Sequence, residues 1–181
     1  MIQQEHFNKG VLYIIVCGTE YATRVHNFVG KAQQAGWEVC VVLTPMATRF
    51  VDVAQLAQLT KHPVRSEYKR PEDPDVLPRA DALLVFGATF NTINKWALGI
   101  SDNLALGLLC EYTGLKKPIL AIPVVRQGGG LDTHPAFSQS LHTLRRYGIS
   151  VFYEPEVYPP RNEVPDEIIL GKLQRVMEDH D

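Results

Sequence analysis

Short, continuously apolar runs alternate with amphipathic stretches along the whole chain. A continuous apolar run bounded by polar residues is typical of a strand that is buried on both faces of a parallel sheet. Such runs predict six strands, at residues 11–17, 38–43, 62–65, 82–86, 118–124 and 149–153. Between them, apolar residues recur at helical spacing. The predicted helices run from about residue 22 to Gly36, over 47–59, 92–112 and 135–147, and from 166 onward.

This regular alternation predicts the architecture of the chain. It indicates an α/β fold, a three-layer Rossmann-like (flavodoxin-like) domain with a parallel sheet of about six strands. We expect a single domain over residues 1–181, with an N-terminal tail at 1–10 and a loop and C-terminal helix at 154–181. Two loops stand out, because residues 67–78 are charged and contain three prolines, and residues 127–133 are glycine-rich and expected to be flexible.

Composition narrows the choice of partners. With 45% hydrophobic and 21% charged residues, and no apolar run of about 18 residues, neither disorder nor a transmembrane helix is expected. A net charge of -2 gives no electrostatic reason to expect a nucleic-acid or membrane partner. The start of the chain is polar, and the three cysteines are widely spaced, which predicts reduced thiols, a cytoplasmic location and no metal site.

The turns that follow the strands are the places to look for chemistry, because ligands of such sheets bind at the carboxyl ends of the strands. Gly18 and Thr19 close the first predicted strand, where a glycine allows close approach to the backbone and free N–H groups suit a phosphate. A tight turn without a ligand is an equally good interpretation of this pair. Thr44 adds a hydroxyl after the second strand, and alone it is better interpreted as a helix N-cap.

The segment from residue 87 to 104 is harder to explain by packing alone. Thr89, Asn91 and Thr92 lie where the fourth predicted strand becomes a helix. Further along that predicted helix come Gly99 and an Asp-Asn pair, which lower helix propensity without improving the packing. Local inconsistency of this kind is typical of functional sites.

This segment carries a resemblance to a known family. The chain reads Thr44-x-x-Ala47-x-x-Phe50, and later Asn91-Thr92-x-x-Lys95-x-Ala97-x-Gly99-x-x-Asp102-Asn103-Leu104. Both strings resemble the homo-oligomeric flavin-containing cysteine decarboxylases, which include phosphopantothenoylcysteine decarboxylase and the lantibiotic peptidyl-cysteine decarboxylases. The resemblance runs from about residue 11 to 109 and more faintly through 135–153.

The resemblance implies FMN as the cofactor. It assigns the phosphate and ribityl chain to Gly18, Thr19 and Thr44, and places Thr89, Asn91 and Thr92 along the flavin, with Asn91 reaching the substrate carboxylate. Asp102 and Asn103 are expected to support that loop. The cofactor-binding residues expected on this basis are Gly18, Thr19, Glu20, Thr44, Thr89, Phe90, Asn91, Thr92, Asp102, Asn103 and Val124. Phe50 is better interpreted as core.

Three features depart from the family pattern. Asp73 stands where the family has a histidine, and a carboxylate is a poorer base than an imidazole for a thiol proton. Arg126 lies in the stretch after the fifth strand where the family has Pro-x-Met-Asn-x-x-Met-Trp. It is better interpreted as a surface loop residue, and the alternative is a ligand for a substrate anion. No cysteine occurs after Cys110 to match the cysteine of the family's substrate flap. The candidate catalytic residues are therefore Asn91 and Asp73, and the candidate substrate-binding residues are Asn91 and Arg126.

Three functions remain open. The first is a diverged FMN-dependent enzyme, decarboxylase-like or a related oxidoreductase, that acts on a small-molecule or peptide substrate. The second is a non-catalytic FMN-binding subunit that assists or regulates a partner, and the third is a phosphate-ligand protein that no longer holds flavin. A homo-oligomer, trimer first, is also expected, because the family forms trimers and because Leu104 and Leu106 point to opposite faces of one predicted helix.

Overall fold

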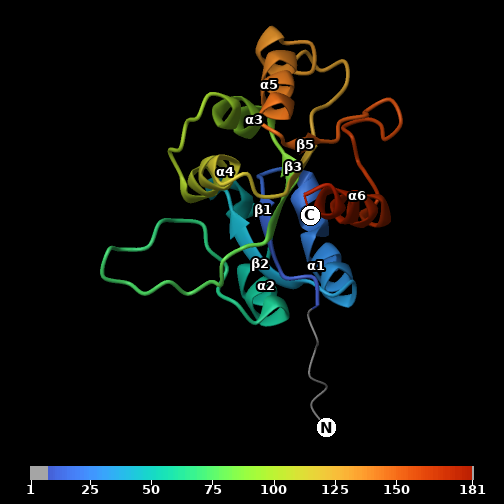
Figure 1. Ribbon diagram of the computed structural model, residues 1–181. Coiled ribbons are helices and arrows are strands. Elements are labelled where there is room, and N and C mark those ends of the chain that lie inside the picture. Colours follow the sequence, from blue (N-terminus) through green and yellow to red (C-terminus); the bar gives the residue numbers. More distant parts are fainter. Residues whose placement is uncertain (1–7, 181) are drawn as a thin grey trace.

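Five parallel strands form the central sheet in the computed structural model, which describes residues 8–180 (Figure 1). The strands lie in the order β2-β1-β3-β4-β5. Their bounds are β1 Val11–Val16, β2 Glu38–Leu43, β3 Ala82–Ala88, β4 Ile119–Pro123 and β5 Ser150–Val151. Every residue of β3 and β4 is buried, as expected where helices cover both faces of a sheet. Residues 1–7 of the predicted tail lie outside the described residues.

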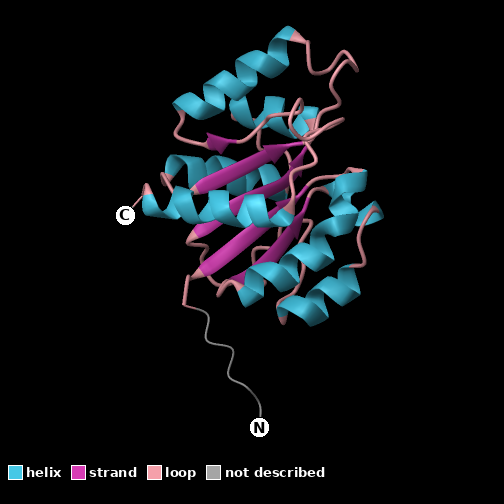
Figure 2. Cartoon of the chain, turned by 90° about the vertical axis from the view of Figure 1, so that its right-hand side faces the viewer, coloured by secondary structure: helices cyan, strands magenta, loops and turns pink. Residues whose placement is uncertain are grey.

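Helices cover the sheet on both faces, which gives three layers (Figure 1, Figure 2). One hydrophobic core joins the sheet to α1, α2 and α6, and a second joins it to α3, α4 and α5. The helices are α1 Val25–Gln34, α2 Val53–Thr60, α3 Phe90–Ala97, α4 Leu104–Gly114, α5 Pro135–Arg146 and α6 Asp166–Glu178, with two short 3₁₀ helices, η1 Glu20–Arg24 and η2 Pro45–Arg49. The predicted three-layer α/β fold is confirmed.

The predicted strand at residues 62–65 is reduced to a single bridge. Arg65 pairs with Val42, through hydrogen bonds that join the Leu43 N–H to the Arg65 carbonyl (2.7 Å) and the Arg65 N–H to the Val41 carbonyl (3.3 Å). Pro63 has no N–H to donate to a sheet, so the pairing does not extend toward the N-terminus. The sheet therefore has five strands.

The single helix predicted over residues 92–112 is wrong, because the chain breaks it at 98–103. Gly99 adopts a left-handed conformation (φ 72°), and the N–H groups of Gly99 and Ile100 turn back to the carbonyls of Trp96 and Lys95. This arrangement ends a helix and is most readily adopted by glycine. Asn103 then caps α4 by accepting the Leu106 N–H at 3.0 Å. Residues that looked inconsistent inside one helix are the end of α3 and the start of α4.

Both apolar faces of α4 are covered within one chain. Leu104, Leu106 and Leu109 all belong to the second hydrophobic core and are at most 9% exposed. The opposite directions of Leu104 and Leu106 therefore give no reason to expect a second protein surface on this helix. The apolar side chains that do reach the surface nearby are Leu98, which is 75% exposed, and Ile100, which is 40% exposed, both in the break between α3 and α4.

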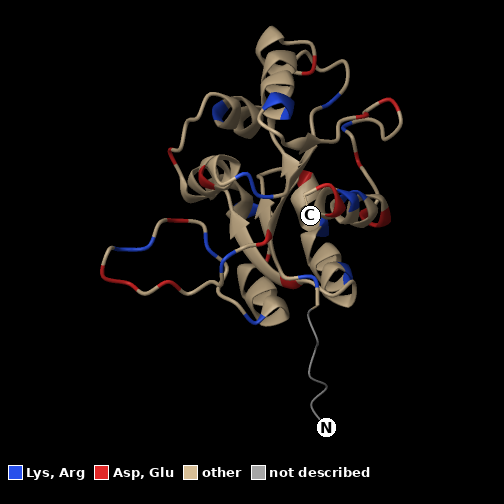
Figure 3. Cartoon of the chain, in the orientation of Figure 1, with Lys and Arg blue, Asp and Glu red and all other residues tan. Residues whose placement is uncertain are grey.

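The charged loop at residues 67–78 extends away from the sheet and carries side chains of both signs (Figure 3). Tyr68 fixes its base, because its hydroxyl donates to the Asn103 carbonyl (3.1 Å) and its ring lies over Gly107. A Cβ atom at Gly107 would lie 2.0 Å from the Tyr68 hydroxyl oxygen, so this contact requires glycine. Across residues 8–180, none of the helices combines the length and apolar character that crossing a bilayer requires.

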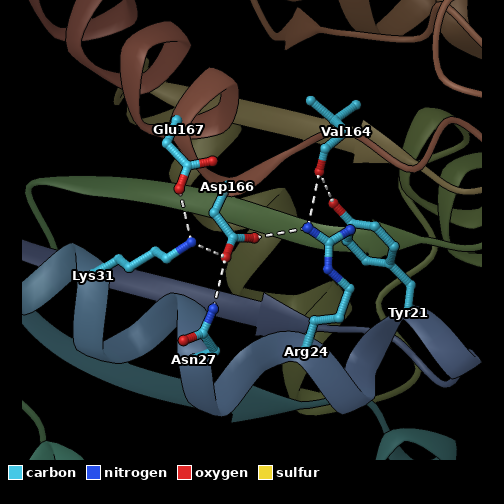
Figure 4. A network of polar contacts seen from close by, with 7 residues as sticks. All are labelled: Tyr21, Arg24, Asn27, Lys31, Val164, Asp166 and Glu167. Atoms are coloured by element: carbon cyan, nitrogen blue, oxygen red, sulfur yellow. Dashed lines mark hydrogen bonds and ion pairs between the residues drawn. The ribbon is translucent and has the colours of Figure 1, made fainter.

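A buried carboxylate fastens α6 to α1 (Figure 4). Asp166, the first residue of α6, accepts from Arg24 (2.8 Å), Lys31 (2.9 Å) and Asn27 (3.1 Å), and its own side chain is only 4% exposed. Beside it, the Tyr21 hydroxyl donates to the Val164 carbonyl at 2.8 Å, and burial raises the pKa of Tyr21 to about 12. These contacts hold the segment before α6 against the turn that follows β1.

Candidate functional site

The strand order reverses between β1 and β3, and ligands of open α/β sheets bind beyond the carboxyl ends of the strands at such a point. Two adjoining hollows lie there. One hollow, of about 460 Å³, lies beyond the end of β2, where Thr44 lines it, and we call it the β2 hollow. The other, of about 580 Å³, lies beyond the end of β4, where Val124 lines it, and we call it the β4 hollow. Phe50, Thr89 and Asn91 line both. We call the two hollows together the cleft, and its size suits a cofactor or another small molecule.

The cleft gathers every residue predicted to bind cofactor or substrate. The predicted residues in the wall of the β2 hollow are Gly18, Thr44, Thr89, Asn91, Thr92, Asp102 and Asn103. Those in the wall of the β4 hollow are Thr19, Glu20, Thr89, Phe90, Asn91, Val124 and Arg126. The loops after β1, β2, β3 and β4 therefore converge on one place. Phe50, which sequence reasoning favoured as core, packs on the first core and also lines both hollows.

A glycine brings the first two loops together. A Cβ atom at Gly18 would lie 2.7 Å from the Cβ of Met46 and 2.9 Å from its carbonyl carbon. Real side chains do not approach so closely, so the turn after β1 can lie against η2 only with glycine at this position. This contact brings Thr19 and Thr44 to the same side of the sheet.

The hydroxyls of Thr19 and Thr44 are not used as helix caps. Thr19 precedes η1 and Thr44 precedes η2, and neither side chain accepts a hydrogen bond from its helix. Within residues 8–180 the Thr19 Oγ1 atom is buried and has no hydrogen-bond partner at all. A buried hydroxyl without a partner costs about 1–3 kcal/mol. The residues of the cleft thus fit a ligand that would supply the missing partner, as the phosphate or sugar-alcohol oxygens of FMN could.

Thr89 and Thr92 use their hydroxyls within the protein. Thr89 caps α3 by accepting the Thr92 N–H (3.1 Å), and its hydroxyl donates to Thr92 Oγ1 (3.0 Å). The buried Cys17 thiol donates to the same Thr92 oxygen at 3.6 Å, and burial raises the pKa of Cys17. These residues therefore shape the wall of the cleft, whereas Asn91, in the first turn of α3, is exposed and its side chain has no partner within residues 8–180.

Asp102 and Asn103 stabilise the break between α3 and α4. Asp102 forms an ion pair with Lys95 of α3, and Asn103 donates to Asp102 at 3.3 Å while capping α4. Both residues line the β2 hollow, as does Thr44. They join the last turn of α3 to the first turn of α4.

Arg161 lines the β4 hollow and was missed by sequence reasoning. Its Nη1 atom lies 2.8 Å from Glu20 Oε2, which joins the loop before α6 to the turn after β1. The glycine loop beyond Arg126 has a defined shape, because the Asp132 carboxylate accepts from the N–H groups of Gly128 (2.7 Å) and Gly130 (3.0 Å). Hydrogen bonds from these amides, Gly128 first, hold the pKa of Asp132 below its usual value.

Asp73 does not lie in the cleft of its own chain. It lies in the charged loop, where it accepts the Arg70 N–H at 3.1 Å, and it lines a separate hollow with Arg65 and Tyr68. Over the described residues no histidine lines either hollow of the cleft. His134 contacts one residue of the cleft, because its ring lies edge-on to that of Phe90 with the ring centroids 5.5 Å apart. Its Nδ1 atom, however, accepts the Ala136 N–H and caps α5. Nor do residues 8–180 bring together three side chains that could ligate a metal.

A larger hollow, of about 650 Å³, lies under the charged loop between Tyr68 and α4. Its charged groups include the Lys69–Asp75 ion pair, whose Nζ and Oδ1 atoms are 2.9 Å apart. The tyrosine hydroxyls in its wall have partners, as Tyr13 donates to the Pro78 carbonyl at 2.6 Å. The cleft, with its unpartnered Thr19 hydroxyl, is the better candidate site.

The chain is also similar in sequence to known proteins. The chain is 32% identical over 141 residues to phosphopantothenoylcysteine decarboxylase of Mus musculus, which covers 74% of this chain and 67% of that protein. It is 29% identical over 154 residues to the coenzyme A biosynthesis bifunctional protein CoaBC of Bacillus subtilis, covering 82% of this chain. The chain spans 36% of the length of that bifunctional protein and 38% of a second one, from Borreliella burgdorferi.

Solved structures share the fold. The cypemycin decarboxylase CypD superposes with a TM-score of 0.75 at 22% identity, over 97% of this chain and 98% of that one. The FMN binding protein AtHal3 gives a TM-score of 0.76 at 20% identity, over 95% and 98%. The Flavoprotein family matches residues 2–178 of this chain. These comparisons confirm the predicted family and fold and support FMN as the cofactor. The chain belongs to the Flavoprotein family.

Proposed function

We propose that the cleft binds FMN and that the protein is a diverged flavin-dependent enzyme for a small-molecule or peptide substrate. The observation that carries the proposal is the Thr19 hydroxyl, which is buried and partnerless within residues 8–180 at the wall of the β4 hollow. Gly18, Thr19 and Thr44 would hold the phosphate and ribityl chain. Thr89, Asn91 and Thr92 would line the flavin, with Glu20, Phe90 and Val124 completing the wall and Asp102 and Asn103 supporting it.

When bound, FMN supplies a two-electron acceptor. The protein's own contribution is orientation and exclusion of water. Asn91 presents an amide donor without a protein partner in the described chain, which suits a substrate carboxylate. Phe90, Val124 and Leu131 give the β4 hollow apolar walls, which strengthen a polar contact made inside it.

A catalytic role for Asp73 requires a neighbouring copy of the chain, since Asp73 lines neither hollow of its own cleft. We propose that the protein forms a homo-oligomer, a trimer or a multiple of trimers, as in the family. The exposed Leu98 lies beside a hollow lined by Gly99, Gly114 and Tyr147, and Tyr147 is itself 51% exposed. Burial of this apolar surface against a second copy is the physical reason to expect assembly. Light scattering that shows a monomer with a full complement of flavin would contradict a shared site.

The proposed reaction is tested by mixing the FMN-loaded protein anaerobically with cysteine, a peptide ending in cysteine, or phosphopantothenoylcysteine. We expect loss of the visible flavin absorbance, with carbon dioxide release, for a cysteinyl acid. The reaction should be slow with each of the three substrates, phosphopantothenoylcysteine included, because no histidine lines the cleft in the described chain and an aspartate is a poor base for a thiol.

A second candidate is a non-catalytic FMN-binding subunit. The similar fold of AtHal3, described as an FMN binding protein, and the missing histidine in the cleft favour it. The same experiment separates the two functions. A protein that holds FMN stoichiometrically, yet shows neither flavin reduction nor carbon dioxide release with any of the three substrates, would support the binding subunit.

A further inference from the structure

We propose that Arg126 and Arg161 together form a binding site for an acidic group of the substrate, a carboxylate or a phosphate monoester, at the outer wall of the β4 hollow. The inference rests on the proposed function, because it takes the β4 hollow as the substrate side of the cleft. It adds a residue, Arg161, and a chemical class of substrate. Both arginines line the hollow, although they come from different loops.

The backbone joins the two arginine-bearing loops directly. The Gln127 N–H, one residue after Arg126, donates at 2.9 Å to the carbonyl of Pro160, one residue before Arg161. On the other side of Arg161, Asn162 is fully buried, and its amide donates at 2.9 Å to the carbonyls of Pro123 and Phe152. Each guanidinium therefore extends from a backbone that is fixed to the end of β4.

The stem of Arg126 is also supported. The glycine loop folds back beneath it, so that a Cβ atom at Gly129 would lie 3.5 Å from Arg126 Cβ and 3.7 Å from its Cγ. The Asp132 carboxylate holds this fold by binding two of the loop's N–H groups. The Arg126 guanidinium itself has no hydrogen bond or ion pair within residues 8–180. A supported arginine with an unused planar fork of five donors is suited to binding an acid.

Within residues 8–180 the Arg161 guanidinium has one partner, Glu20, which competes only weakly with an incoming acid. Glu20 Oε2 lies 2.8 Å from Arg161 Nη1, but the Glu20 side chain is 80% exposed and that of Arg161 is 38% exposed. An ion pair this exposed contributes little to stability, because water screens it. An incoming acid can therefore displace Glu20 at small cost and gain both guanidinium groups.

The surroundings favour an acid over other ligands. The two arginines and Glu20 leave an excess of one positive charge at this wall, while Phe90, Val124 and Leu131 supply apolar surface around it. These apolar side chains can contact the part of the substrate that lies between its acidic end and Asn91. The geometry points to a substrate whose acidic end binds the arginines and whose other end reaches Asn91.

The test uses the FMN-loaded protein and three matched probes: propanol, propionate and propyl phosphate. Dissociation constants are measured by ligand-observed NMR at low ionic strength, where screening is weakest. We expect both acids to bind at least tenfold more tightly than propanol. Arg126→Gln and Arg161→Gln should each reduce this advantage about threefold, and the double variant should abolish it. Arg146→Gln, which removes the same charge from the exposed end of α5, is the matched control and should change nothing.

Glu20→Gln gives the opposite expectation. If Glu20 competes with the acid for Arg161, this variant should bind both acids about threefold more tightly; weaker or unchanged binding would overturn the competition. Equal binding of acids and propanol by the native protein, or an advantage that survives in the double variant, would overturn the arginine site. The tighter of the two acids identifies the group as carboxylate or phosphate. Flavin content is measured separately. A protein that holds no flavin would refute the proposed function, whereas the affinities of the arginine variants for the three probes test the arginine site alone.

Discussion

Replacing Thr19 with valine should have opposite effects on the flavin-free and the flavin-bound protein. Valine has nearly the shape of threonine, with a methyl group in place of the hydroxyl. Because Thr19 Oγ1 is buried without a partner in the described chain, the substitution removes an unsatisfied polar atom. Leaving such an atom buried costs about 1–3 kcal/mol, so Thr19→Val should raise the free energy of unfolding of the flavin-free protein by about 1 kcal/mol.

The same substitution should weaken FMN binding, because the ligand would lose the hydrogen bond to this hydroxyl. A hydrogen bond of about 1 kcal/mol corresponds to a dissociation constant roughly five- to tenfold higher. Urea unfolding of the flavin-free protein and fluorescence titration with FMN measure the two effects. Thr23→Val is the control, since the exposed Thr23 hydroxyl already donates to the Glu20 carbonyl at 2.7 Å, and it should leave FMN affinity unchanged. A less stable Thr19→Val protein with native FMN affinity would refute the assignment of Thr19.

Three other substitutions test separate parts of the structure. Asn91→Asp should lower the flavin content of the purified protein, because an amide donor becomes an acceptor-only carboxylate; undiminished flavin would contradict this. Asp166→Asn should lower the free energy of unfolding, measured in urea, by about 2 kcal/mol. This is less than breaking a fully buried ion pair usually costs, because Arg24 and Lys31 are about one-third exposed and water can hydrate them once the carboxylate is gone. The pKa of Asp132 is lowered in the folded protein, so its contribution is present above the ordinary carboxyl pKa of about 3.9 and is lost as the pH falls through the lowered value. Hydrogen-exchange protection of the Gly128 and Gly130 amides should fall in that acid range, and at every pH in Asp132→Ala, which removes both acceptor oxygens; protection that persists in the variant would contradict the role of the carboxylate.

The strands and the place of the candidate site in the fold were largely predictable because both depend on local patterns. Continuous apolar runs mark strands buried on both faces, and residues that directly follow those strands must meet at one edge of the sheet. This is why Thr19, Thr44, Thr89 and Asn91 were found together. The break after α3 was missed even though its signals are local, because Gly99 and Asn103 were interpreted as functional residues inside a helix and not as its end and the next start.

Arg161 could not be found from the sequence because its position depends on tertiary contacts. It lies in a proline-rich loop without regular structure, and the buried Asn162 beside it, with a left-handed φ of 68°, fixes the path of that loop. For Asp73, the resemblance to the family predicted a role that its position within one chain does not support. Its alignment with a family position says nothing of where a long charged loop extends, and the structure places it apart from the cleft of its own chain.

A crystal structure of the protein grown with FMN tests the central claim most directly. We predict FMN in the cleft, with a ligand oxygen within hydrogen-bond distance of Thr19 Oγ1 and the flavin beside Asn91. FMN bound instead in the larger hollow under Tyr68, or a cleft that stays empty at saturating FMN, would contradict the account.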